Sequence, residues 1–310
     1  MRQLLILFLL LFIFLSISFA QTSGELVARA DSLYRAKDYQ ASGEMYDLAF
    51  AQHEGASSAL YNAACSWALA GDADRALNYI ERTLAAGWNN DQWMLQDSDL
   101  KLIQDNVLFK KMLEPLTVER LKREAQYNQP LKKQLEAIEV RDQTLRLLLG
   151  DVSARFGRDS EHMDYFTSIM HEKDSINEME VINIIEKHGW LGKSEVGSKA
   201  NNALWLVIQH APLATQEKYI PLLRESVANG ESEGSQLALT EDRIRMYKGE
   251  KQIYGSQVKR DQETGKFYVC PVIDPYNVNT RRAEVGLQPI EQYVMQWNIT
   301  WNPATVNDRE

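Results

Sequence analysis

Residues 59–88 read ALYNAACSWALAGDADRALNYIERTLAAGW, and residues 30–50, ADSLYRAKDYQASGEMYDLAF, match them at a fixed offset of 34 residues. In each copy, Lys or Gly followed by Asp ends a first helix and opens a second one. The offset aligns four pairs of positions: Ala30 with Ala64, Leu33 with Trp67, Asp38 with Asp72, and Phe50 with Leu84. The sequence therefore predicts two consecutive helical hairpins.

A 34-residue period of this kind resembles the tetratricopeptide repeat, in which small residues such as Ala63, Ala64 and Ala76 stand where paired helices approach closely. Each hairpin has an apolar face that it cannot bury alone, so residues 90–116 are expected to continue and cap the array. We assign residues 21–116 to a tetratricopeptide-repeat domain with a helical cap. The resemblance implies a concave surface that holds a protein or peptide partner; the alternative is packing within the chain.

Residues 1–20 have the three-part pattern of a signal peptide, with Arg2 at the start, an apolar run from Leu4 to Leu15, and small residues up to Ala20. Cleavage before Gln21 predicts an exported protein, periplasmic or extracellular. The alternative is an uncleaved N-terminal anchor. After cleavage no segment is apolar enough to span a membrane, because a span needs roughly 20 apolar residues.

The whole chain has 310 residues and a formal charge of −9, which indicates a globular protein of about two domains. An acidic chain of this kind is a poor partner for nucleic acid, since phosphate binding needs clustered Lys and Arg. The two cysteines, Cys65 and Cys270, fall in different predicted domains, and we expect two buried free thiols rather than a bridge.

Residues 117–130 are charged and end at Pro130, so we assign them to a linker; a solvated connecting helix is the alternative. Residues 131–310 are predicted to form a helical domain of unknown function, with helices over residues 177–188, 202–211 and 237–246. Residues 252–258 and 267–273 are rich in β-forming residues and flank a polar loop, which predicts a β-hairpin near 252–273. The expected fold class is mainly α, with one small hairpin.

Three polar residues in this domain are catalytic candidates. Asp142 lies inside an apolar stripe of helical spacing, where a carboxylate is costly unless it is paired. His210 stands at the end of an interior helix that Pro212 terminates, and histidine is the residue type most often used as a general acid or base. Asp242 lies on a further predicted helix. For each of them a structural role, as a buried polar network or a helix end, is the alternative.

Other polar residues are candidates for ligand binding, either because they neighbour these three or because they can bind a carboxylate or phosphate. Arg146 is four residues after Asp142, so an ordinary ion pair within one helix also explains it. The adjacent arginines 281 and 282 have an equally simple interpretation as a solvated basic pair. The candidates are Arg146, Gln209, Arg243, Gln257, Arg281 and Arg282.

Six short motifs in order resemble a bacterial domain family of unknown function over roughly residues 131–294. Ser256 stands where the family motif usually has threonine, which keeps the hydroxyl. The family implies no activity. The motifs are Asp142-Gln143 with Arg146, His188-Gly189-Trp190, Gln209-His210, Asp242-Arg243, Tyr254-Gly255-Ser256-Gln257, and Arg281-Arg282.

The sequence contains no zinc-binding His or Cys spacing, no Gly-rich phosphate loop and no nucleophile elbow. We therefore expect no metal and no cofactor. The favoured function is an exported protein that binds a partner through its repeats and a ligand through its second domain. The alternative is an envelope hydrolase or transferase with a polar cleft around Asp142, His210 and Asp242; convergence of these side chains on an open pocket would favour it.

Overall fold

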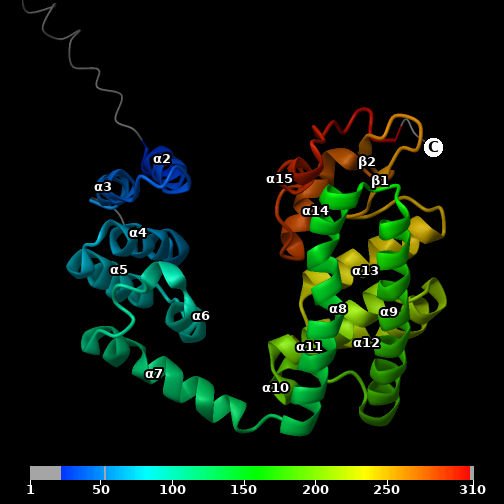
Figure 1. Ribbon diagram of the computed structural model, residues 1–310, viewed down its shortest axis with the longest axis horizontal. Helices are drawn as coiled ribbons and strands as arrows, with labels where there is room; N and C mark the ends of the chain where they lie inside the picture. The colour runs from blue at the N-terminus through cyan, green and yellow to red at the C-terminus, as the bar shows by residue number, and fades with distance from the viewer. Residues whose placement is uncertain (1–21, 52–53, 308–310) are drawn as a thin grey trace, which may run out of the picture. The chain divides into compact units, whose positions relative to one another are not determined.

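The structure is a computed structural model that describes residues 22–51 and 54–307. The chain divides into two compact units between Arg123 and Glu124, and each is described by itself (Figure 1). The first 20 residues, which we predict to be a signal peptide, lie outside the described residues. None of the helices in the described part of the chain has both the length and the apolar character of a membrane span.

Unit 1 begins with two helical hairpins whose helices start at positions 34 residues apart. Asp38 and Asp72 begin the second helix of each hairpin, because their carboxylates accept a hydrogen bond from the main-chain N–H three residues on. The chain reverses through left-handed residues at Lys37 and Gly71. The four helices are α2 (Ser23–Arg35), α3 (Tyr39–Ala49), α4 (Ser57–Ala70) and α5 (Ala73–Ala85).

The hairpins of unit 1 pack around one apolar core, to which the following segment also contributes. Gly43 lets α3 approach α4 closely, since a Cβ atom there would lie 2.5 Å from the Trp67 ring. Met94, Leu100 and Phe109 are fully buried in the same core. The segment consists of α6 (Asp91–Gln96), the short helix η1 (Ser98–Leu100) and α7 (Val107–Glu124).

Helix α7 runs through the first half of the segment that we expected to be a linker. The charged residues from 117 to 124 form its solvated C-terminal turns, in line with the alternative of a connecting helix. A new helix begins at Gln129, with Pro130 in its first turn, where the missing N–H has no cost.

Unit 2 is built on two long neighbouring helices, with the C-terminal end of the chain around a small sheet (Figure 1). Helix α11 packs against both long helices, and α12 packs against α13. The helices are α8 (Gln129–Phe156), α9 (Glu161–His188), α10 (Lys193–Val196), α11 (Ser198–His210), α12 (Leu213–Ala228), α13 (Gly234–Tyr247), η2 (Pro275–Asn277), α14 (Val278–Glu284), α15 (Ile290–Val294) and η3 (Met295–Trp297).

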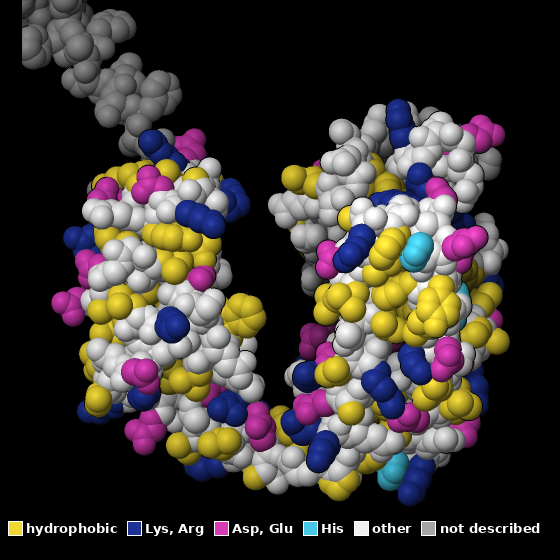
Figure 2. All heavy atoms as spheres, in the orientation of Figure 1, with side chains coloured by type: hydrophobic (Ala, Val, Ile, Leu, Met, Phe, Trp, Pro, Cys, Tyr) yellow, Lys and Arg dark blue, Asp and Glu magenta, His cyan; other side chains and the backbone are white. Residues whose placement is uncertain are grey.

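The core of unit 2 lies where α8, α9 and α11 meet, around Leu135, Val181 and Leu204. Helix α9 ends as predicted at Gly189, which has φ of 77°. It begins 16 residues before the predicted start at 177. The prediction starts too late because the first half of the helix has no fully buried residue to give an apolar period. Figure 2 shows that apolar side chains interrupt the charged surface of α8 and α9; Leu147, Tyr165 and Met179 are among the exposed ones.

The mainly α fold with a small antiparallel hairpin is confirmed. Its strands are β1 (Val258–Arg260) and β2 (Phe267–Val269), with Lys259 opposite Tyr268. The strand predicted over residues 252–258 is wrong except for its last residue. Residues 253–257 form an irregular loop instead, and Gly255 has φ of 68° with Ile290 packed against it. The reason is a carboxylate that binds this loop, described below.

Candidate functional site

The candidate site is centred on Asp142, which lies on the face of α8 that also carries Leu135 and Ile138. These residues are spaced by three and four positions, so all three point into the core, and only 1% of Asp142 is exposed. A buried carboxylate is costly without partners. Helix α8 itself and helix α11 supply them.

Three side chains contact the Asp142 carboxylate. Its Oδ1 atom lies 3.1 Å from Nδ1 of His210 and 3.2 Å from Nη1 of Arg146, and its Oδ2 accepts a hydrogen bond of 2.7 Å from Gln143. Burial alone would raise the pKa of Asp142, but the hydrogen bonds and charges of His210 and Arg146 outweigh burial and hold this pKa below its usual value. Asp142 is therefore an anion at neutral pH.

Arg146 extends this cluster from α8 to α9. Its Nη1 donates to the main-chain carbonyl of Asp142 at 2.8 Å, and its Nη2 donates to both carboxylate oxygens of Asp174 at 2.9 Å. Both Nη atoms are thus engaged by protein groups. The series His210, Asp142, Arg146, Asp174 links α11, α8 and α9.

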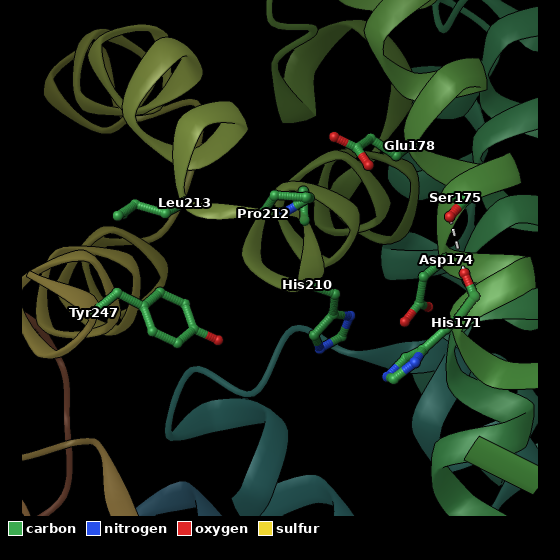
Figure 3. Close-up of a pocket in the computed structure, with 9 residues that line it drawn as sticks. His171, Asp174, Ser175, Glu178, His210, Pro212, Leu213 and Tyr247 are labelled. Carbon is green, nitrogen blue, oxygen red and sulfur yellow. Dashed lines mark hydrogen bonds between the residues drawn. The ribbon is translucent and has the colours of Figure 1, made fainter. Parts of the chain in front are cut away.

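A pocket of about 550 Å³ opens beside this cluster. His171 and Asp174 point into it from α9, His210 points into it from α11, and the Tyr247 hydroxyl points toward His210 (Figure 3). One wall is apolar. The lining residues are His171, Asp174, Ser175, Glu178, His210, Ala211, Pro212, Leu213 and Tyr247.

The His210 ring connects the buried cluster with the pocket. Its Nδ1 atom contacts Asp142, whereas no hydrogen-bond partner of Nε2 occurs within residues 22–51 and 54–307. The side chain is 19% exposed. An imidazole held by a carboxylate at one nitrogen, with the other nitrogen facing a pocket, is the arrangement of a general base.

Helix α9 contributes polar side chains to this pocket that no sequence motif marks. His171, Asp174 and Glu178 are spaced by three and four residues, so they share one helix face. This polar face would have been found by extending the helix upstream of residue 177. Glu178 accepts a hydrogen bond of 2.7 Å from Thr215.

Asp242, the third catalytic candidate, does not line this pocket. It is fully buried, and its carboxylate accepts main-chain hydrogen bonds from Ile253 at 2.7 Å, Tyr254 at 3.1 Å and Ser256 at 2.9 Å. Burial raises the pKa of Asp242, although these donors act in the opposite direction. Asp242 thus shapes the loop at 253–257, and this explains why no strand forms there.

Of the ligand-binding candidates, Arg243 contacts both Gln209 and Gln257. Arg243 donates from Nη1 to the main-chain carbonyl of Gln209 at 2.7 Å and from Nε to Oε1 of Gln257 at 3.2 Å. Gln209 is 4% exposed, and its own Nε2 donates to the carbonyl of Leu239. These three side chains support the end of α11.

Arg281 and Arg282 bind main-chain carbonyls. Arg281 donates to Ile253 at 2.8 Å and Arg282 donates to Tyr254 at 2.7 Å, so both hold the loop that surrounds Asp242. Arg282 is fully buried, and its guanidinium lies 4.8 Å from the Tyr293 ring. The interpretation of these arginines as a solvated pair does not describe Arg282.

Unit 1 has a pocket of its own, of about 430 Å³, between α2, α4 and the segment that contains α6 and η1. Three carboxylates face it, and each accepts a tyrosine hydrogen bond: Asp31 from Tyr46, Asp97 from Tyr61, and Asp99 from Tyr34. Among the described residues none of the three carboxylates forms an ion pair, and Trp93 at the rim is 57% exposed.

Cys65 lies beneath the same pocket, and its Sγ is 3.9 Å from Asp97. Three atoms that could bind a metal ion, Sγ of Cys65 and one carboxylate oxygen each of Asp97 and Asp99, lie within 4.8 Å of one another. Both Cys65 and Cys270 are free and buried, and burial raises the pKa of each thiol. Neither thiol is therefore suited to act as a nucleophile.

These features define a mainly helical domain in which a histidine beside a pocket contacts a buried aspartate. The chain belongs to a family of unknown function, DUF6624, whose model matches residues 129–301. The expected membership in a domain family of unknown function is thereby confirmed at the level of the family. Searches of curated proteins and of solved structures found no match.

Replacing Asp142 by Asn tests the buried cluster. At pH 7 we expect a loss of about 2 kcal/mol in the free energy of unfolding, because charged hydrogen bonds to His210 and Arg146 are lost. The pKa of Asp142 is depressed in the folded protein, so its stabilisation is present above the ordinary value of 3.8 and lost as pH falls through the folded-state pKa. Urea unfolding between pH 7 and pH 3 measures both effects.

The matched control is Asp151→Asn, on the exposed surface of the same helix. We expect the stability of the control to follow the wild type at every pH. A gap between wild type and Asp142→Asn that is equally large at pH 7 and pH 3 would contradict the assignment of Asp142 as a stabilising anion.

Proposed function

We propose that unit 2 is an acid–base catalytic domain, of hydrolase or transferase type, in a protein that its first 20 residues predict to be exported. The observation that carries the proposal is the contact between Nδ1 of His210 and the buried Asp142 at the edge of a pocket. This contact leaves Nε2 of His210 available to exchange a proton with a molecule in the pocket. The sequence alone favoured ligand binding. Of the three residues expected to form a polar cleft, Asp142 and His210 lie together beside an open pocket, whereas Asp242 lies outside it. The support for the catalytic alternative is therefore His210 and its contact with Asp142.

In the hydrolysis of an ester or another acyl substrate, a water molecule in the pocket transfers a proton to Nε2 of His210. At the same time the water oxygen attacks the acyl carbon of the substrate. The bond to the leaving group then breaks, and the proton on Nε2 passes to the leaving group. Asp142 stabilises the imidazolium that forms between these events. The Nη atoms of Arg146 are engaged by Asp142 and Asp174, so Arg146 holds these two carboxylates in place. The Tyr247 hydroxyl points toward His210 and can donate a hydrogen bond to the substrate in the pocket.

Hydrolysis of p-nitrophenyl acetate tests this role with a simple probe. We expect His210→Gln to lower the rate by about 100-fold relative to wild type, which is the usual contribution of a general base. The matched control is His188→Gln, since His188 is also the last residue of a helix but lies exposed outside the pocket. Equal rates in wild type and His210→Gln would refute the proposal.

We propose a second function for unit 1, which is to hold a protein or peptide partner that presents a Lys or Arg side chain. Residues 21–116 resemble tetratricopeptide repeats, and the 34-residue period recurs in the first residues of α2 and α4 and of α3 and α5. The specific support is the pocket of Asp31, Asp97 and Asp99, whose negative charge has no ion-pair partner among the described residues. The exposed Trp93 at its rim offers a cation–π contact.

A fluorescent peptide of alternating Lys and Gly, compared with one of alternating Glu and Gly, tests this surface by anisotropy. We expect wild type to bind the Lys peptide, and the double variant Asp97→Asn with Asp99→Asn to bind it about tenfold more weakly, as for the loss of a close charge pair. The control is Asp74→Asn with Glu81→Gln, which removes two exposed charges from α5. Equal weakening in both double variants would show that only net charge matters and would refute the site.

A further inference from the structure

The end of α11 places His210, and this end is held from outside the helix. Pro212 follows closely, so the last carbonyls of α11 have no partner within the helix. The carbonyl of Gln209 belongs to the peptide bond that leads into His210. It accepts a hydrogen bond of 2.7 Å from Nη1 of Arg243 and a longer one of 3.3 Å from Gln216.

Arg243 is a costly residue to use for this purpose. Burial lowers the pKa of its guanidinium, and no carboxylate lies within ion-pair distance of it in the part of the chain that the structure describes. Arg243 is only partly buried, but a partly buried cation without a counter-charge is still costly, and a neutral donor would satisfy one carbonyl at lower cost. Packing alone therefore gives no reason for an arginine here.

The geometry of Arg243 gives such a reason. Its Nε donates to Oε1 of Gln257, and Nε2 of Gln257 donates to Oγ of Ser256 at 2.9 Å. The main-chain N–H of Ser256 in turn binds Asp242, the neighbour of Arg243 on α13. The planar guanidinium is thus fixed at two nitrogens, so that Nη1 meets the Gln209 carbonyl in one orientation.

We propose that Arg243 is the positioning residue of His210: through the Gln209 carbonyl it fixes the end of α11, so that Nδ1 of His210 meets Asp142 and Nε2 faces the pocket. Gln257 is the support of Arg243 in this arrangement. This inference rests on the proposed catalytic function of His210. It assigns Arg243 a role that acts through another residue, without contact to the substrate.

The test compares Arg243→Met, which keeps the length of the side chain but has no donor, with Arg243→Lys, which keeps the charge and one donor. For p-nitrophenyl acetate we expect kcat of the Met variant to fall about 10- to 100-fold with KM almost unchanged, because a small misplacement of the base has this effect. The Lys variant should recover part of the loss. The control Arg245→Met removes an arginine of the same helix that binds the carbonyl of Lys251 and pairs with Glu250.

The ¹⁵N spectrum of the His210 ring provides a readout independent of activity. In Arg243→Met we expect the signal of the Nδ1–H bound to Asp142 to weaken, with thermal unfolding showing that the variant is folded. A folded Met variant with wild-type kcat and an unchanged ring spectrum would overturn the proposal. If Arg243→Met does not fold, the Lys variant and Gln257→Leu decide it by the same two readouts, and wild-type values in both would overturn it. If wild type has no His210-dependent hydrolysis, the proposed function fails, while the ring spectrum still tests the positioning.

Discussion

The buried carboxylate of Asp142 is the constraint on which unit 2 depends. An anion in a helical core must be compensated, and here the compensating groups come from α8 itself and from α11. His210 on α11 contacts the carboxylate directly, and Arg146 connects it to Asp174 on α9. The requirement that stabilises the packing of these helices also leaves one imidazole nitrogen facing the pocket. Structure and proposed chemistry thus have one cause.

A second buried carboxylate, Asp242, is compensated in a different way and has a different consequence. Main-chain N–H groups of residues 253–256 surround it, so a segment rich in β-forming residues becomes a loop. This loop carries Gln257, which supports Arg243, and Arg243 supports the peptide bond before His210. The two carboxylates are therefore parts of one arrangement: Asp142 orients the His210 ring, and Asp242 shapes the frame that holds its backbone.

The features that can be predicted from the sequence are those that one local signal determines. The 34-residue offset, the caps at Asp38 and Asp72, and the helix end at Gly189 each depend on residues close in the chain. The cost of Asp142 in an apolar stripe indicated a polar network, and His210 is its partner. The contacts of Asp242 with a loop eleven or more residues away could not be predicted, because the spacing of apolar and polar residues along the chain carries no information about them. The polar face of α9 was missed since that half of the helix buries no apolar residue.

The tautomer of His210 is the most direct test of the central claim, which is that Asp142 orients this ring as a base. Long-range ¹H–¹⁵N NMR, at a pH where the imidazole is neutral, identifies the nitrogen that carries the proton. The account predicts Nδ1–H in the wild type, with Nε2 free to accept a proton, and a shift toward Nε2–H in Asp142→Asn. A wild-type ring protonated at Nε2, or a tautomer that Asp142→Asn leaves unchanged, would contradict it.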